Sequence, residues 1–481
     1  MISPLTLITR TGRAGRTRLR DLLRSIVQRG LEKGSTFCEA RYFENRGNSI
    51  IVENGVAKAL GSRISRGVGV RVIFGRRWGF ASTNVPDRTS TEGALSDAIS
   101  AARSIAGSAT EEAQIATVES ETETVMHSVK TPPDSVSPEQ KVKQILDIEK
   151  AARSFDRRVK DTFVNYRDSW TKVTVCNSFG TSVEETTPRT FVFCRVISRE
   201  GANMQTALEY SGGVEGCELI ERAQSEGLPQ KAADKAVKLL SAHSPPRGTQ
   251  TVIVDQRVGG LFMHEAFGHN SEADAVLAGQ SIVADKIGQK VASDSVTIVD
   301  DPTVSGNGSY TYDDEGVKAE PHIIVKDGVL VGFLHSLESA AKLKARPQGS
   351  ARAQSHQYPP IIRMSNTYLA PGTMTLDEML RDTRTGVYLT GSHSGYVETQ
   401  KGQFTCRVEQ GWLIENGNLT EHLRDVSFSG LTLDALKSIS AVGRDFKIDA
   451  PGTCGKDDQN IPTDAGAPHF RIDRIVVGGR A

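Results

Sequence analysis

The sequence predicts an α+β fold with a helix-flanked N-terminal domain that contains a mixed sheet, followed by a largely antiparallel, β-rich C-terminal domain. Helical periodicity alternates with strand-like runs over the first 246 residues, whereas short strands and turns dominate from residue 295 onward. With 481 residues, 38% of them hydrophobic, the chain is long enough for two or more cores.

Residues 18–107 form the predicted N-terminal α/β domain. Apolar residues at helical spacing over 18–33 predict its first helix, which Gly34 ends. Strand-like segments follow at 36–44, 48–54 and 67–83, the last with the glycine pattern of a hairpin. Residues 88–107 return to helix.

Residues 1–17 are predicted to be an extension of this domain. Six arginines and no acidic residue before Asp21 occur in the first 24 positions. Such a composition is typical of a transit-type leader, but a frayed leader that runs into the first helix is the favoured interpretation.

The middle of the chain divides into a polar stretch and a central segment. Residues 108–136 are polar and acidic, which predicts a linker or surface excursion. Ser137 and Gln140 have the spacing of a capping box, so a helix is expected to begin there and to run to about Phe155. The rest of the central segment, 137–246, contains strand-like alternation at 158–215 and a helix at 230–242.

Residues 247–481 are expected to form the C-terminal domain. Its predicted strands lie at 250–255, 296–301, 322–336, 387–391, 411–422 and 470–479. Asp327-Gly328 and Asn416-Gly417 each separate two apolar runs, which is the signature of a tight hairpin turn.

Composition excludes several classes of protein. Lys+Arg and Asp+Glu both total 58, and a net charge of zero argues against nucleic acid as a partner. No apolar run approaches the roughly 18–20 residues of a membrane span, and no secretory signal is recognisable. The six cysteines are far apart, which favours reduced, buried thiols and a cytoplasmic location.

Residues 264–274, HEAFGHNSEAD, contain the strongest candidate for a metal site. His264 and His269 could bind zinc, and Glu265 could act as the base that takes a proton from a water, as in HExxH enzymes. A third ligand must come from elsewhere, and the candidates are Cys454, which lies between glycines and near a lysine, and the remaining histidines.

The spacing of the two histidines poses a geometric problem. In a regular helix, residues five apart point roughly 140° away from each other. Either a π-type bulge brings His269 back under His264, or the helix ends at Gly268 and the chain swings His269 inward. Asp255 is the expected N-cap of this helix. Residues 272–274 could be further ligands, groups that orient the histidines, or a solvated turn, and the last two are favoured.

Motifs along nearly the whole chain resemble the TldD branch of the TldD/PmbA metallopeptidase family. Besides HEAFGHNSEAD they are GVGVRVIFGRRWGFAST (67–83), YDDEG (312–316), KDGVLVGFLHS (326–336), IRMSNTYLAPG (362–372), WLIENG (412–417), AVG (441–443) and TCGKDDQ (453–459). The resemblance implies one Zn²⁺ held by His264, His269 and Cys454, with Glu265 as general base. It further implies hydrolysis of short or unfolded peptides by the catalytic subunit of a heterodimer with a PmbA-like (TldE) paralogue.

Departures from the family pattern concern loops: Asp458 stands where the family commonly has glycine, and 391–398 and 462–468 differ as well. Arg363 and Asn366 are candidate oxyanion donors, although each fits a structural role better. Two rival functions stay open. One is a non-catalytic interaction subunit stapled by zinc, and the other is a regulator of the gyrase-modulator type.

Overall fold

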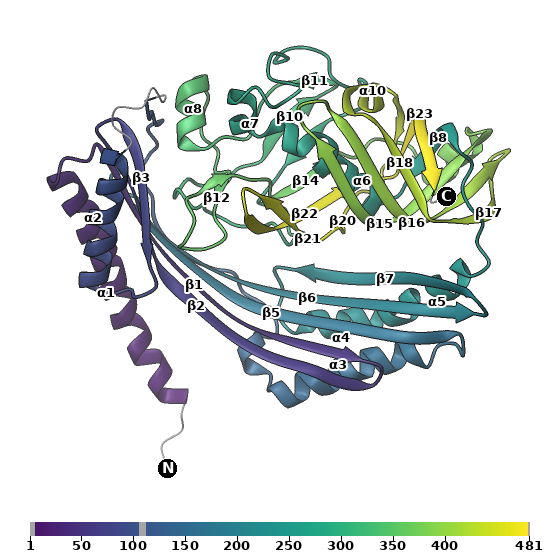
Figure 1. Ribbon diagram of the computed structural model, residues 1–481, viewed down its shortest axis with the longest axis horizontal. Helices are drawn as coiled ribbons and strands as arrows, with labels where there is room; N and C mark the ends of the chain where they lie inside the picture. Colours follow the sequence, from purple (N-terminus) through teal and green to yellow (C-terminus); the bar gives the residue numbers. More distant parts are fainter. Residues whose placement is uncertain (1–4, 105–111, 480–481) are drawn as a thin grey trace.

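The computed structural model describes residues 5–104 and 112–479, with the backbone alone described for 5–17. A long curved sheet, backed by helices, supports a second, β-rich lobe on its concave side (Figure 1). This architecture confirms the predicted α+β class. Within the described ranges, no helix has the length and apolar character that crossing a membrane would require.

The curved sheet is built from both N-terminal segments of the chain. Its strands are β1 (Phe37–Glu53), β2 (Val56–Phe74), β3 (Arg77–Thr83), β4 (Thr122–Met126), β5 (Val159–Asn177), β6 (Ser182–Glu200) and β7 (Asn203–Gly213). They follow the order β3-β2-β1-β5-β6, and β4 and β7 share the outer edge of β6. Only β4 runs parallel to its neighbour, so the sheet is mixed. Because β1 pairs with β5 over its length, the 18–107 and 137–246 segments share one sheet.

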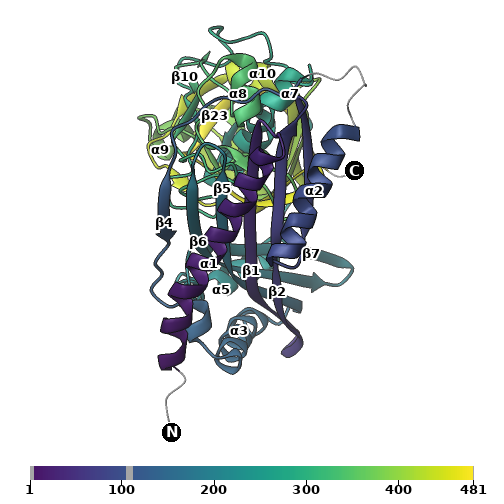
Figure 2. The same cartoon turned by 90° about the vertical axis from the view of Figure 1, so that its left-hand side faces the viewer.

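Helices cover the convex face in two groups (Figures 1 and 2). The first group is α1 (Leu5–Glu32) and α2 (Arg88–Ser104), and the second is α3 (Pro138–Arg153), α4 (Glu218–Ser225) and α5 (Leu228–Leu239). Each group encloses its own core: Leu23 and Leu95 lie in one, Ile145 and Val192 in the other. Ser137 forms the predicted capping box with Gln140.

Several predicted boundaries differ from the structure. The first helix begins at Leu5, and α4 was not foreseen. Within 108–136, which was expected to be irregular, 122–126 form an edge strand and 133–135 a 3₁₀ turn. The two strands expected at 36–44 and 48–54 are one strand. The strand continues through Gly47, where a Cβ would lie 2.4 Å from the Asp168 carbonyl oxygen, so glycine allows the close contact with β5.

The C-terminal lobe contains a ring of strands and a second sheet. The ring consists of β8 (Gly248–Val254), β15 (Thr385–Glu398), β16 (Gln403–Glu415), β18 (Val426–Leu431) and β23 (Phe470–Gly479), with β17 (Asn418–Arg424) and β19 (Ile439–Val442) attached. The second sheet comprises β9 (Ile298–Asp300), β10 (His322–Lys326), β11 (Val329–Leu330), β14 (Asn366–Leu369), β20 (Lys447–Ile448), β21 (Gly452–Lys456) and β22 (Gln459–Ala467). Most of the pairings are antiparallel, as expected; β8–β15 and β14–β22 are parallel.

Smaller elements complete this lobe: β12 (Ala351–Arg352), β13 (Ile361–Ile362), α6 (Gln256–Phe262), α7 (Ala273–Leu277), α8 (Leu337–Leu343), α9 (Leu376–Arg381) and α10 (Thr432–Lys437). Both predicted hairpin turns are present, with positive φ angles at Asp327, Gly328, Asn416 and Gly417.

Helix α6 is held tightly between the two β-structures. The ring of Phe262 lies 4.9 Å from that of Phe404 and 6.1 Å from that of Phe470. On the other side, a Cβ on Gly260 would meet the Gly466 backbone nitrogen at 2.7 Å. The helix that leads to His264 therefore has little freedom to move.

Candidate metal centre

The helix begins at its predicted cap and then widens. The Asp255 carboxylate accepts a hydrogen bond from the Val258 amide at 2.8 Å. After Phe262, residues Met263–Gly268 form a π-helix in which the His269 amide donates to the His264 carbonyl. This i→i+5 bond places both histidines on one side of the helix, so the first of the two expected devices is the one present.

Gly268 does not end the helix, which was the second of the two arrangements expected from the sequence. Its φ of −53° is right-handed, so the helix does not end there through a left-handed residue. A Cβ at this position would lie 2.1 Å from the Met364 sulfur. Glycine is needed here because Met364 packs directly against the π-helix.

His264, His269 and Cys454 meet at the end of α6. Their ligand atoms lie within 4.8 Å of one another, and the Cys454 Sγ is 3.4 Å from the His269 Nε2. In tetrahedral zinc sites, with Zn–N about 2.0–2.1 Å and Zn–S about 2.3 Å, two ligand atoms are about 3.5 Å apart. The donor set and the spacing therefore fit zinc. No other cluster of three His, Cys, Asp or Glu ligands occurs in the described part of the chain.

Residues 272–274 orient the site and do not join the ligand cluster. The buried Glu272 carboxylate lies 3.0 Å from the Nδ1 of His269, which leaves the Nε2 facing Cys454. Lys456 donates to both oxygens of Asp274 at 2.8 and 2.7 Å, and its ammonium lies 3.3 Å from Glu272. The favoured interpretation of this segment agrees with these contacts.

The electrostatics of the site favour a thiolate. Burial raises the pKa of Cys454, but the nearby His264 and His269 outweigh it and lower this pKa from 9.0 to about 4. Burial likewise raises the pKa of Glu272, while Lys456 and His269 outweigh that effect and lower it to about 2. Both groups are thus anionic at neutral pH, as a ligand and its orienting partner should be.

Glu265 lies beside the cluster, on the side of the π-helix that faces β15. A Cβ on Gly395 would come within 2.5 Å of the Glu265 Cγ, so the bare backbone of β15 makes room for this side chain. Within the part of the chain that the structure describes, no residue donates a hydrogen bond to the Glu265 carboxylate. It is available to a water or a substrate.

Arg363 and Asn366 have structural partners. Arg363 is fully buried and donates to the carbonyls of Cys454 and Gln459, which anchors the β21–β22 hairpin. Asn366 donates to the carbonyls of Asp301 and Val304. The anchoring role of Arg363 had no signal in the sequence, because this residue lies 91 positions from Cys454.

Comparison with known proteins identifies the family. Models of the PmbA/TldA metallopeptidase match domain 1 at residues 38–106, the central domain at 131–240 and the C-terminal domain at 247–479. A metalloprotease of Methanothermobacter thermautotrophicus is 38% identical over 95% of this chain and 99% of its own length. The chain belongs to the PmbA/TldD family.

Other PmbA/TldD relatives carry more specific names. A zinc metalloprotease TldD homolog of Saccharolobus solfataricus is 27% identical over 94% of this chain and 99% of its own. Among solved structures, a candidate modulator of DNA gyrase from Thermotoga maritima superposes with a TM-score of 0.79 at 23% identity, covering 95% and 99% of the two chains. TldE of Thermococcus kodakarensis gives 0.77 at 17%, covering 95% and 100%. These two solved structures share their fold with nearly the whole of this chain.

Proposed function

We propose that this chain is a zinc-dependent peptidase that hydrolyses short or unfolded peptides. The observation that carries the proposal is the convergence of two imidazoles and one thiolate, with a free carboxylate beside them. His264, His269 and Cys454 would hold the ion. Three protein ligands are typical of catalytic zinc, whereas structural zinc is usually closed by four.

The chain's own residues supply the acid–base chemistry. A bound zinc ion supplies Lewis acidity and lowers the pKa of a coordinated water toward about 7. Glu265 accepts the proton of the attacking water and later donates it to the leaving amine nitrogen. Glu272 holds the ring of His269 in the tautomer that leaves its Nε2 free to bind.

Glu265→Gln tests the assignment of the base. The variant should retain zinc, because the ligands are untouched, and should lose peptide hydrolysis by roughly 10²–10⁴-fold. Zinc content and cleavage of an unfolded peptide are measured on the same preparation. Glu398→Gln, a change at a partly exposed carboxylate on β15, is the matched control. Unchanged cleavage by a zinc-loaded Glu265→Gln variant would remove Glu265 from the mechanism.

The proposed working form is a cytoplasmic heterodimer with a PmbA/TldE-like paralogue. Family membership and the fold shared with a TldE protein support such a partner. Purification with and without the paralogue, followed by zinc and peptidase assays, tests whether it is needed. Zinc that resists chelators, together with no hydrolysis in either sample, would favour the non-catalytic alternative.

A further inference from the structure

A groove separates the concave face of the curved sheet from the C-terminal lobe. It consists of two adjoining pockets of about 810 and 500 Å³, which share Asn45, Arg63, Arg189 and Pro462. Volumes of this size are typical of ligand-binding sites. Thr453 of β21 lines the larger pocket, whereas its neighbour Cys454 belongs to the metal centre. Groove and metal centre therefore lie on opposite faces of one strand.

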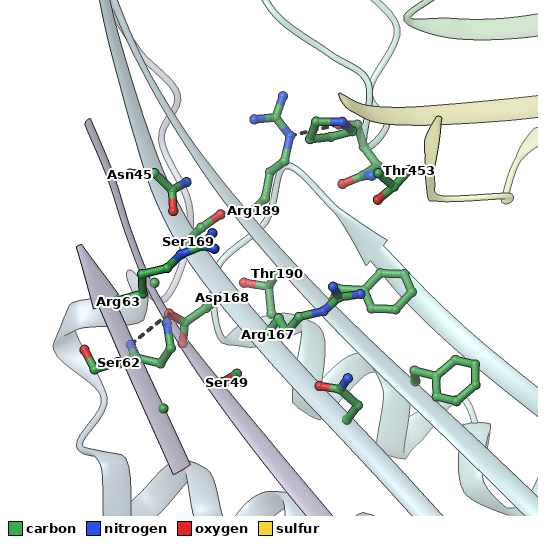
Figure 3. A pocket seen from close by; sticks show the side chains of 18 of the residues that line it. Asn45, Ser49, Ser62, Arg63, Arg167, Asp168, Ser169, Arg189, Thr190 and Thr453 are labelled. Carbon is green, nitrogen blue, oxygen red and sulfur yellow. Dashed lines mark hydrogen bonds between the residues drawn. The ribbon is translucent and has the colours of Figure 1, made fainter. Parts of the chain in front are cut away.

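Arginines stand on the floor of this groove (Figure 3). Arg63 on β2, Gly47 on β1, Ser169 on β5 and Arg189 on β6 are successive partners in one cross-strand row. The two small residues leave space between the arginines. Arg167 lines the same pocket two positions before Ser169, on the same face of β5. The side chains of Arg63, Arg167 and Arg189 therefore all line the larger pocket.

These arginines have no anionic partner among the residues that the structure describes. Arg189 donates to the carbonyls of Asn307 and Ser309, both at 2.9 Å. Arg167 lies over the Phe191 ring at 5.3 Å, and Arg63 is exposed. Burial, together with the neighbouring Arg352, lowers the pKa of Arg189 to about 10, as expected for a charge that is poorly compensated.

The acidic residues at the groove are already engaged. Asp168 binds the Lys141 ammonium at 2.6 Å beneath the sheet. Glu185 accepts hydrogen bonds from the amides of Thr311 and Tyr312 at 2.8 and 2.9 Å. The free charge that the groove presents is therefore positive.

We propose that this groove binds the carboxylate of a peptide, supplied by its C-terminus or by an acidic side chain. The inference rests on the proposed peptidase function, because the groove shares β21 with the metal centre. Guanidinium groups bind carboxylates through paired, charge-assisted hydrogen bonds. Phe163, Phe191 and Phe193 line the same pocket and can contact an apolar residue next to the carboxylate. Single-stranded nucleic acid is the competing polyanion, and the zero net charge of the chain favours a peptide.

Fluorescence anisotropy on the full-length, zinc-loaded Glu265→Gln protein tests the proposal without substrate turnover. The probe is a labelled six-residue peptide with phenylalanine before its last position. It is compared as the free acid, as the C-terminal amide, and as an amide that carries one glutamate. The free acid should bind roughly tenfold more tightly than the plain amide. Tight binding of the glutamate-bearing amide would show that a side-chain carboxylate is sufficient.

Arg63→Gln combined with Arg167→Gln should abolish the difference between acid and amide. Neither side chain has a hydrogen bond within the described structure, so the fold should persist, which circular dichroism checks. Arg66→Gln is the matched control, since Arg66 lies on the same strand with its side chain on the opposite face. It should bind like the parent protein.

Three results would overturn the inference: equal affinity for the free acid, the plain amide and the glutamate-bearing amide, an equal loss in Arg66→Gln, or displacement of the peptide by an oligonucleotide at lower concentration. Hydrolysis is measured separately on the protein with Glu265 intact. A chain that binds carboxylates through Arg63 and Arg167 but cleaves no peptide contradicts only the peptidase function. If the Arg63→Gln/Arg167→Gln variant cleaves peptide like the parent protein, and all three peptides bind equally, only the proposed role of the groove is contradicted.

Discussion

At the scale of single residues, the candidate centre depends on side chains that contact the proposed ligands and fix their orientation. His269 is oriented by Glu272, and Glu272 is itself held by Lys456. The Cys454 carbonyl is tied to Arg363. Each contact limits the directions in which a ligand atom can point, which is how a protein tunes affinity for a metal.

Glu272→Gln should lower zinc affinity by roughly ten- to a hundredfold, because the neutral amide no longer holds the His269 ring as a carboxylate does. Competition with a chromophoric chelator measures this affinity. Glu320→Gln, at a carboxylate that pairs with the exposed Arg346, should leave it unchanged. Equal affinity of the Glu272→Gln and parent proteins would show that Glu272 has no influence on the ligand.

Histidines outside the centre should determine how the fold responds to acid. Burial, reinforced by His322, lowers the pKa of His335 from 6.5 to about 4. Between pH 6.5 and 4, His335 is therefore protonated in the unfolded chain but neutral in the folded chain. The stability present above pH 6.5 is lost as the pH falls toward 4. This amounts to about 3 kcal/mol at most. His335→Asn should make the unfolding midpoint depend less on pH between 6.5 and 4. His393→Asn, at an exposed histidine, should leave this pH dependence unchanged.

At the scale of elements, the π-helix is what allows two histidines five positions apart to share a site. Its register depends on the close approach of Gly268 and Met364. Glycine in a helix normally costs about 0.5–1 kcal/mol relative to alanine. An added Cβ at Gly268 would lie 2.1 Å from the sulfur of the buried Met364, so the Met364 side chain would have to shift. We expect this cost to outweigh the helix propensity that alanine would add.

Gly268→Ala should destabilise the protein by about 1–3 kcal/mol and weaken zinc binding. Denaturant unfolding and chelator competition measure the two effects. Gly93→Ala is the control: that helical glycine has open space around it, so alanine should stabilise by about 0.5–1 kcal/mol. Adding Met364→Ala should restore zinc binding to Gly268→Ala, and failure to do so would mean that the clash is not what disturbs the site.

At the scale of the whole molecule, Arg257 on α6 joins the two lobes. Its guanidinium lies 2.8 Å from Glu209 and donates to the Tyr210 carbonyl at 3.0 Å, both on β7, and lies 3.2 Å from Asp449 in its own lobe. The helix that precedes His264 is therefore fastened to the curved sheet. Loss of this contact should loosen the lobes from each other.

Arg257→Gln should cost about 3 kcal/mol, because it leaves Glu209 without one of its cations at a largely buried position. Calorimetry should then resolve two transitions in place of one, as the lobes unfold separately. Arg346→Gln, which breaks an exposed pair, should cost under about 1 kcal/mol. A single, unshifted transition in Arg257→Gln would argue that other contacts unite the lobes.

Local patterns in the sequence were sufficient for much of the secondary structure. The capping box at Ser137, the N-cap Asp255 and the two hairpin turns depend on neighbours in the chain, and all are present. The α+β class follows from the same periodicities. The resemblance to the family also indicated Cys454 as the third ligand beside the two histidines.

Tertiary structure alone decided what depends on distant residues. The π-helix is present and not a helix end at Gly268, and its Gly268 packs against Met364, which lies 96 positions away. The union of two N-terminal segments in one sheet, and the row that joins Arg63 to Arg189, arise from strand pairing across long stretches of chain. Local sequence encodes local backbone preference, but register and packing depend on partners that only the folded chain brings together.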